Sequence, residues 1–437
     1  MRPDPRLADD PARQRWHHVL RLRDYRLYLV LQLVASAGVW IQRLAQDWLV
    51  LQLSGSPAAV GVAVAAQFIP MLVLGPAAGV LVDALPKRRV LAWTQGIGLS
   101  LAAALGILAA IGQLGLPAVY ASCVLLGVVA AVDGPARQVL VSDVVGDAML
   151  PTAVALNNAM GQLGAMLGPA LGGLILAGPG AAAAFGANAL CGVAGIALLL
   201  SLRSPALRLP ASRRTGTRTT APPGPGGDGA ARSGRAPAIL AGTVYILRRP
   251  RLLATVALSG CMGAFGMNGP VVLTAFAEDV WHSGAAGFGL YNTVAAVGAV
   301  AGSLLGARLR LTTQPRLVLA AAGFGLAQGA AALMPTEGLF VAVLVLVGVA
   351  TLVYLSAAGT SVQLAAEPAV RGRVMAVYLP LLMGGHALGG LLTGWLTEWL
   401  GVRAGLVATG ALAVFAAGLT AAALWRLRRS AGRFPQN

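Results

Sequence analysis

Long apolar runs, separated by short polar or basic segments, dominate this chain of 437 residues. A helix that crosses a membrane needs about 20 mostly apolar residues, and the pattern supplies twelve such runs. We therefore predict an all-α polytopic membrane protein with twelve spanning helices. They cover residues 27–53, 58–83, 90–112, 117–137, 150–178, 181–202, 252–277, 285–309, 317–334, 338–365, 374–400 and 404–425.

A stretch rich in Arg, Pro and Gly divides the twelve runs into two sets of six. This stretch cannot bury a core, so it is predicted to be a flexible linker, with a short amphipathic helix near residues 239–247 that lies on the membrane. Glycines recur at one spacing in both halves, at 164, 168 and 173 and again at 385, 389 and 394. This fits two parallel six-helix halves, the repeat of a large class of secondary transporters, with a chance match among the 57 glycines as the alternative. The predicted parts are an N-terminal tail (1–26), a first bundle (27–202), a linker (203–250), a second bundle (251–425) and a C-terminal tail (426–437).

The charge pattern orients the chain in a membrane. Hydrophobic residues make up 57% and charged residues 11%, about half the charged fraction of a soluble domain. A net charge of +17 would suit a nucleic-acid-binding protein, but thirty of the 32 Lys and Arg fall in the tails and loops of one side. By the positive-inside rule that side is cytoplasmic. We expect both termini in the cytoplasm, a multi-pass place in the inner membrane, and no nucleic-acid partner.

The sequence offers no signal for enzymatic or cofactor chemistry. The three cysteines lie in separate spans, and no spacing suggests a metal site or a disulfide framework. Lys87 is the only lysine and no phosphate-cradling loop precedes it, so ATP is not the direct energy source. We predict no enzyme activity, no cofactor and no metal. The expected partners are a small-molecule substrate and the lipid bilayer, and the chain is expected to act as a monomer.

The segment between the second and third spans resembles a signature of the major facilitator superfamily. It reads Gly79-Val-Leu-Val-Asp83-Ala-Leu-Pro-Lys87-Arg88-Arg89, and the signature has a glycine, an aspartate four residues later and then clustered cations. The chain departs from it at Ala84, where an arginine is common, and at Pro86. A second-half copy, 302–310, keeps two arginines and has no aspartate. The resemblance implies two six-helix halves and secondary transport.

Further motifs narrow the resemblance to exporters. The fifth span contains Gly164-x-x-x-Gly168-Pro169-x-x-Gly172-Gly173, which is similar to the motif of drug–proton antiporters in this superfamily. The stretches 40–50, 133–138 and 371–375 resemble the branch of enterobactin exporters and transmembrane secretion effectors. The resemblance implies proton-coupled export of a small apolar or amphipathic molecule, such as a drug, siderophore or secondary metabolite. An importer, or a receptor or assembly protein that keeps the fold, stays open because fold does not fix function.

Asp47 and Arg43 are the candidate proton-coupling residues. They lie four apart within the first span, on one helix face where they can pair. An ionisable side chain inside a membrane is costly and marks a functional site by default. The alternative is a permanent ion pair without a coupling role. The candidate residues for a substrate cavity are Trp40, Gln42, Gln46, Asn157 and His386, although a lone histidine between glycines is more often a helix–helix hydrogen-bond partner.

A conformational latch is predicted at the cytoplasmic end of the second span. The Asp83 carboxylate is expected to be stabilised at the positive N-terminus of the eleventh span in only one transport state. A static surface network is the alternative. In the fifth span the glycines and Pro169 predict a kink and a close helix crossing, with packing alone as the alternative to a coupling role. The predicted latch residues are Gly79, Asp83, Lys87, Arg88, Arg89, Asp133 and Arg137.

Overall fold

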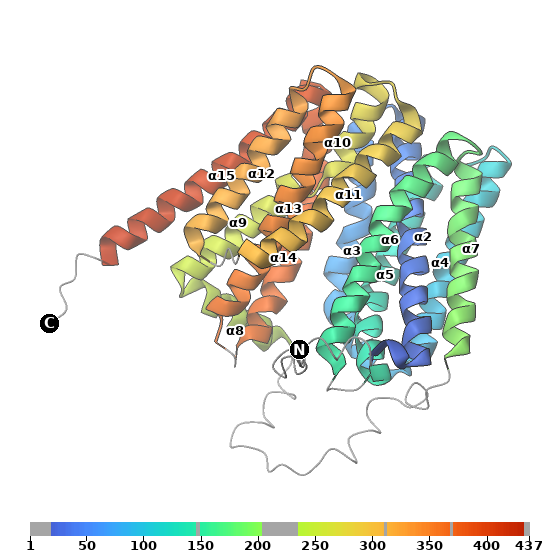
Figure 1. Ribbon diagram of the computed structural model, residues 1–437, viewed down its shortest axis with the longest axis horizontal. Helices are drawn as coiled ribbons and strands as arrows, with labels where there is room; N and C mark the ends of the chain where they lie inside the picture. The colour runs from blue at the N-terminus through green and yellow to red at the C-terminus, as the bar shows by residue number, and fades with distance from the viewer. Residues whose placement is uncertain (1–18, 146–148, 203–234, 310–312, 368–369, 432–437) are drawn as a thin grey trace, which may run out of the picture. The chain divides into compact units, whose positions relative to one another are not determined.

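The computed structural model describes residues 19–145, 149–202, 235–309, 313–367 and 370–431, apart from some side chains within these ranges. These residues are almost entirely helical and contain no strand (Figure 1). The helices of the first half are α2 (Arg23–Ser54), α3 (Pro57–Ala84), α4 (Lys87–Ala110), α5 (Leu116–Val145), α6 (Leu150–Ala177) and α7 (Ala181–Ser201).

The second half begins with a short helix, α8 (Arg235–Leu247), and continues with long helices. These are α9 (Pro250–Gly266), α10 (Gly269–Ala275), the π-helical turn η5 (Phe276–Val280), α11 (Gly284–Leu309), α12 (Gln314–Ala332), α13 (Glu337–Ala365), α14 (Arg371–Leu400) and α15 (Val402–Ala431). Tight turns join neighbouring helices, as at Gly55 and Gly401, whose positive φ angles of 65° and 86° suit glycine.

Eleven segments in the described part of the chain are long and apolar enough to cross a membrane. The remaining predicted span, 317–334, which is the ninth in chain order, is occupied by α12, which is less apolar because it carries Gln314, Arg316 and Gln328. The buried Gln328 Nε2 donates to Thr409 Oγ1 at 2.7 Å, so the amide nitrogen has a partner inside the helix bundle. The prediction of an all-α multi-pass membrane protein is confirmed.

The seventh predicted span, 252–277, is not one continuous helix. α9 ends at Gly266 and α10 begins at Gly269, although the whole segment Pro250–Val280 still counts as one span. Pro270 has no N–H to donate to the preceding turn, which breaks the helix. The Asn268 side chain bonds back to the last turn of α9, since its Nδ2 donates to Ala264 O at 2.6 Å. The break was therefore encoded by Gly269-Pro270.

Two compact units make up the fold, and their boundaries cut through individual helices. The first comprises Met1–Ala45, Val73–Leu114 and Leu125–Thr219. The second comprises Gln46–Leu72, Gly115–Val124 and Thr220–Asn437. The second unit therefore contains parts of α2, α3 and α5 together with every described helix of the second half. Contacts between these first-half segments and the second half lie inside this one unit.

The helix α8 occupies the segment 239–247, where a short amphipathic helix is predicted. Gly242 and Ile246 are buried within the second unit, whereas Leu240, Val244 and Leu247 are exposed. The helix therefore has one protein-facing side and one exposed side that carries apolar residues, and its place on the membrane stays a prediction. The rest of the predicted flexible linker, 203–234, lies outside the described residues.

Candidate functional site

Asp47 lies in a buried polar cluster, which we call the carboxylate cluster (Gln46, Asp47, Gln67, Ser122 and Cys123). The aspartate is 4% exposed, and Gln67 Nε2 of α3 donates to its Oδ1 at 3.4 Å. The same Nε2 lies 3.7 Å from Cys123 Sγ of α5. Gln46 Nε2 donates to Ser122 Oγ at 2.7 Å. Polar side chains from three helices thus surround an ionisable group within an apolar bundle.

The other predicted residues of α2 make contacts within the first unit. The Arg43 guanidinium lies 5.4 Å from the centre of the Trp40 ring, a cation–π arrangement. Gln42, which is 1% exposed, accepts a hydrogen bond from Asn188 Nδ2 of α7. In this structure Gln42 and Gln46 are partners in helix contacts, and their role toward a substrate stays a prediction. So does the pairing of Arg43 with Asp47.

The glycine motif of α6 makes a close crossing with α2. A methyl group at Gly164 would lie 2.5 Å from Ser36 Cβ, and one at Gly168 would lie 2.5 Å from Trp40 Cβ. Gly172 faces Ile41 and Leu44 in the same way, and both Pro169 and Gly173 are buried. Small residues therefore let the two backbones approach, and α6 continues through Pro169. Asn157, two helical turns before Gly164 in α6, is half-buried.

The matching glycines of the second half serve an equivalent crossing. A side chain at Gly385 or Gly389 of α14 would overlap the backbone of α9 at Gly260 or Ala264. The α14–α9 contact in the second unit thus repeats the α6–α2 contact in the first. This supports the repeat that the glycine spacing predicts.

A second stripe of α14 packs against α3 in the second unit. A methyl group at Gly390 would lie 3.1 Å from Val64 Cγ1, and one at Gly394 would lie 2.7 Å from Pro57 O. His386 is 6% exposed and meets the Phe68 ring edge-on, with ring centres 4.3 Å apart. We call this contact the α3–α14 seam. Its residues are Ser56, Pro57, Gly61, Val64, Phe68 and Leu72 on the α3 side, and Gly384, His386, Gly390, Gly394 and Glu398 on α14.

A carboxylate closes one end of the α3–α14 seam. Glu398 Oε2 accepts hydrogen bonds from Ser56 Oγ and, at 3.3 Å, from Ala58 N in the first turn of α3. A negative charge at a helix N-terminus is favourable because the first N–H groups have no partner within the helix. The two helices run antiparallel, so their contacts continue in order to Leu72, which faces Gly384. At Gly75, one turn further along α3, nothing lies within 4 Å of an added methyl group.

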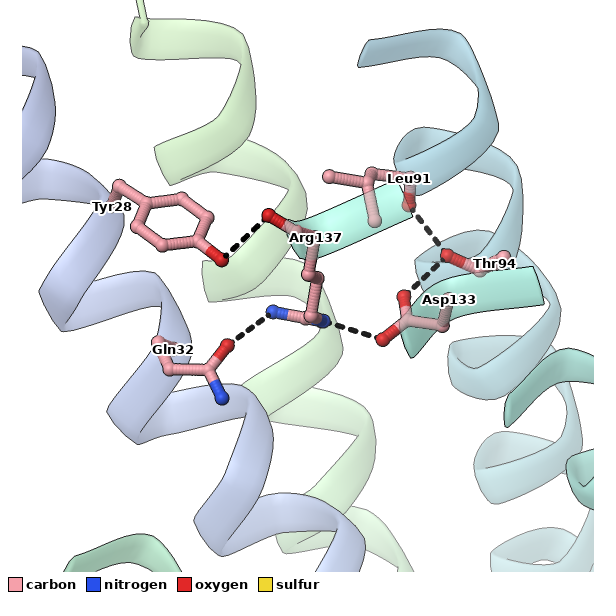
Figure 2. Close-up of polar contacts among 6 residues, drawn as sticks. All are labelled: Tyr28, Gln32, Leu91, Thr94, Asp133 and Arg137. Atoms are coloured by element: carbon pink, nitrogen blue, oxygen red, sulfur yellow. Dashed lines mark hydrogen bonds and ion pairs between the residues drawn. The ribbon is translucent and has the colours of Figure 1, made fainter. Parts of the chain in front are cut away.

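Asp133 and Arg137 form the centre of a network within the first unit (Figure 2). They make an ion pair within α5, and Arg137 Nη1 donates to Gln32 Oε1 at 3.0 Å. Thr94 Oγ1 of α4 donates to Asp133 Oδ1 at 2.7 Å, and Tyr28 Oη donates to Arg137 O at 3.4 Å. These contacts join α2, α4 and α5 to one another. The structure therefore shows this predicted pair holding the first unit together.

The remaining latch residues are placed only in part. Lys87 is 3% exposed and its Nζ donates to the carbonyls of Val82 and Leu85 at the C-terminus of α3. Arg88 Nη2 donates to Leu200 O, near the end of α7, at 2.6 Å. Cations at helix C-termini stabilise the free carbonyls there. Arg89 is exposed. The α3 helix includes Gly79 and Asp83, but these two side chains lie outside the described ones, so the latch stays a prediction.

From the sequence Gln67 is one of several polar residues that could line a cavity, but sequence reasoning did not connect it to Asp47, and it gave Glu398 no role at a site. A neutral glutamine in an apolar helix resembles many other polar positions, and only the fold brings Gln67 to Asp47. Glu398 was visible as an acid at the end of the eleventh span. The Ser56-Pro57 pair is typical of a helix start. Nothing in the sequence, however, indicates that this helix start lies beside Glu398.

Solved transporters share this fold. The structure of the nucleoside transporter NupG has a TM-score of 0.72 with 15% identity, and the match covers 92% of this chain and 99% of that one. A bacterial homologue of the lysosomal transporter Spinster, solved in an inward-facing conformation, gives 0.69 with 16% identity over 92% and 97%. At this identity the likeness defines the class of fold alone, that of the major facilitator superfamily.

The family follows from the sequence comparison. The model of the transmembrane secretion effector family matches residues 17–219 and 231–432, so the chain belongs to that family. The predicted superfamily and branch are confirmed, and the family's members are transporters, not enzymes.

Individual relatives are similar over different lengths. The enterobactin exporter EntS of Shigella boydii is 29% identical over 79% of this chain and 77% of its own length. The multidrug efflux pump Tap of Mycolicibacterium fortuitum is 34% identical over 35% of this chain and 38% of the pump. The staphyloferrin A transporter of Staphylococcus aureus is 26% identical over 40% and 44%. The last two matches span less than half of each relative.

Proposed function

We propose that this chain is a proton-coupled exporter that carries a small apolar or amphipathic organic molecule out of the cell by alternating access. The observation that carries the proposal is the burial of Asp47, 4% exposed, within a membrane-spanning helix. A carboxylate at such a place is costly and is retained where it has a function. The family and the efflux-type relatives support export rather than another use of the fold.

The carboxylate cluster gives Asp47 partners for both of its protonation states. As an anion it accepts the hydrogen bond from Gln67, and Arg43 lies one helical turn away on the same face of α2. As a neutral acid it is less costly to bury. In the proposed cycle one proton from the outside binds an Asp47 oxygen, substrate leaves to the outside, and the same proton is released inward. The proton gradient then supplies the energy, with no resident cofactor.

The α3–α14 seam is proposed to be the outer gate of this cycle. The positive-inside rule places both termini and the linker in the cytoplasm of the cell, which puts the Ser56 end of α3 on the outer side of the inner membrane. The seam is closed in this structure from Glu398 to Gly384. Outward release of substrate therefore requires the glycine-lined part of α14 to separate from α3. The cytoplasmic latch around Asp83 is proposed to act in the opposite state.

The substrate class rests on the relatives' names and on the apolar interior. Siderophore and drug carriers are among the relatives, and the candidate substrate residues include one tryptophan, three amides and a histidine rather than several charges. We propose a largely uncharged or amphipathic molecule, such as a siderophore, a drug or a secondary metabolite. It would contact Trp40, Gln42, Gln46, Asn157 and His386 when the seam is open.

Everted membrane vesicles test the function. Accumulation of a panel of dyes, antibiotics and siderophores is measured with and without a protonophore, in vesicles containing the parent chain, the Asp47→Asn variant or the Asp279→Asn variant. The control acid, Asp279, is exposed in η5. We expect accumulation by the parent and by Asp279→Asn, abolished by the protonophore, and only downhill exchange by Asp47→Asn. Concentrative uptake by Asp47→Asn with an unchanged pH profile would remove Asp47 from the coupling step.

One alternative has its own support, since a D-xylose–proton symporter shares the fold with a TM-score of 0.67 at 14% identity. A symporter would move proton and substrate in the same direction. Intact cells and everted vesicles distinguish the two, because an importer concentrates substrate in intact cells and an exporter concentrates it in everted vesicles.

A further inference from the structure

Two consecutive residues of α3 contact the two buried titratable side chains of the candidate site. Gln67 faces the Asp47 carboxylate on α2, and Phe68 faces the His386 ring on α14. Neighbouring residues of a helix point about 100° apart, so one turn of α3 reaches both sides at once. All four residues belong to the second unit.

The Gln67 side chain is fixed in this position by its surroundings. It is 5% exposed, and its single amide nitrogen approaches Asp47 Oδ1 at 3.4 Å and Cys123 Sγ at 3.7 Å. A buried amide donor without a partner costs free energy, so it stays directed toward an acceptor. The carboxylate is the stronger acceptor of the two when it is charged. The position of α3 therefore responds to the charge on Asp47.

The Phe68 side chain belongs to the α3–α14 seam. Its ring meets His386 one helical turn along from the Val64–Gly390 contact. The spacing of the seam residues on α3, at 57, 61, 64, 68 and 72, is that of one helix face. A small rotation or shift of α3 at Gln67 consequently moves this whole face against α14.

We propose that Gln67 is a positioning residue that transmits the protonation of Asp47 to the α3–α14 seam. This inference rests on the proposed function, in which Asp47 is the coupling carboxylate. With Asp47 charged, the Gln67 hydrogen bond is charge-assisted and holds α3 in the position that lets the substrate-loaded seam open outward. When a proton from the outside occupies the carboxylate, the bond loses its charge assistance, and α3 shifts to the position in which the seam is closed, so that the proton is released inward.

Other ionisable groups face this region and belong to its pH response. Arg43 lies one turn from Asp47 on α2, Cys123 contacts Gln67 from α5, and His386 lies behind Phe68 on α14. A change in pH alone therefore does not isolate the Gln67 contact, and the test depends on variants of similar size.

The test uses Gln67→Met, which keeps the length of the side chain and removes the donor. Gln328→Met is the matched control, because Gln328 is also a buried glutamine of the second unit, bonded to Thr409. Gln67→Asn retains an amide donor. Full-length proteins are compared in vesicles, with ethidium as the transported probe if the parent chain accumulates it, and otherwise with the panel compound that it does accumulate.

Two quantities are measured for each variant, the uphill accumulation ratio and the rate of downhill counterflow. We expect Gln67→Met to lower the accumulation ratio about tenfold, the effect of losing one charge-assisted hydrogen bond, while counterflow stays near the parent value. We expect Gln67→Asn to recover part of the accumulation ratio. We expect Gln328→Met to leave the relation between the accumulation ratio and the counterflow rate as it is in the parent. A merely structural role for Gln67 would lower both quantities together.

Spin labels at Leu53 and Leu400, exposed positions near the Ser56 end of the seam, report the gate directly. We expect the distance distribution of Gln67→Met to stay unchanged over a pH range that shifts the distribution of the parent. If Asp47→Asn abolishes accumulation while Gln67→Met behaves like Gln328→Met in transport and in distance, the inference is wrong and the proposed function stands. If Asp47→Asn still accumulates the probe, the proposed function itself fails.

Discussion

Replacing Gly61 by alanine places a methyl group inside the α3–α14 seam. That methyl would overlap Gly390 O and lie 2.9 Å from its carbonyl carbon. Overpacking of this kind costs about 1–3 kcal/mol, and backbone atoms have little freedom to move aside. The cost arises only while the seam is closed, so the substitution favours the open state by a similar amount. A free-energy difference of about 1–3 kcal/mol changes the ratio of two states roughly five- to 150-fold.

The chain offers a matched control on the same helix. An added methyl at Gly75 has nothing within 4 Å, so Gly75→Ala gives the same gain in helix propensity, about 0.5–1 kcal/mol, without the overlap. The distance between spin labels at Leu53 and Leu400 is measured for the parent, Gly61→Ala and Gly75→Ala. The prediction is a larger long-distance population in Gly61→Ala alone. Identical distributions in the two variants would refute the assignment of the seam as a gate.

Three further predictions concern the seam, the first unit and the topology. Glu398→Gln removes the charge at the α3 N-terminus and should favour the open seam by about 0.3–1 kcal/mol. The same distance measurement checks this, with the exposed Glu278→Gln as control, and no difference from that control counts against a role of Glu398 in closing the seam. Arg137→Lys should lower the free energy of unfolding of the purified protein by about 1–3 kcal/mol, because one ammonium cannot reproduce the contacts to Asp133 and Gln32. The control is Arg316→Lys, at an exposed arginine, and equal melting temperatures of the two variants would contradict this. A single cysteine in the 203–234 segment should resist an impermeant thiol reagent in intact cells, since the basic linker is cytoplasmic; labelling from outside would reverse the topology.

Much of the fold was predictable because membrane helices are specified by local composition. Each apolar run is long enough to satisfy its own backbone hydrogen bonds, so length and hydropathy locate it without knowledge of its neighbours. The exception is the break before Pro270. It was not predicted, because this proline lies within an apolar run that is long enough to form one span. The short helix α8 was predictable for the same local reason, from the pattern of apolar residues along 239–247.

The candidate site was predictable only where one residue is unusual by itself. Asp47 stands out because a carboxylate within an apolar run is costly wherever the run folds. Gln67 and Glu398 acquire meaning only through contacts with distant helices, which no local pattern specifies. For the same reason the Asp133–Arg137 pair was expected in a latch between the halves, whereas the structure shows it bonded to α2 and α4 inside the first unit. Its part in a latch is still a prediction.

Substrate-driven proton movement in proteoliposomes tests the central claim most directly. The vesicles contain a pH-sensitive dye, and the pH is equal on both sides. Their membrane carries the parent chain, Asp47→Asn or Asp279→Asn, and an outward or inward substrate gradient is applied. If Asp47 exchanges protons for substrate, the gradient drives protons in the opposite direction in the parent and in Asp279→Asn, and moves substrate without protons in Asp47→Asn. Proton movement of unchanged size in Asp47→Asn would contradict the claim.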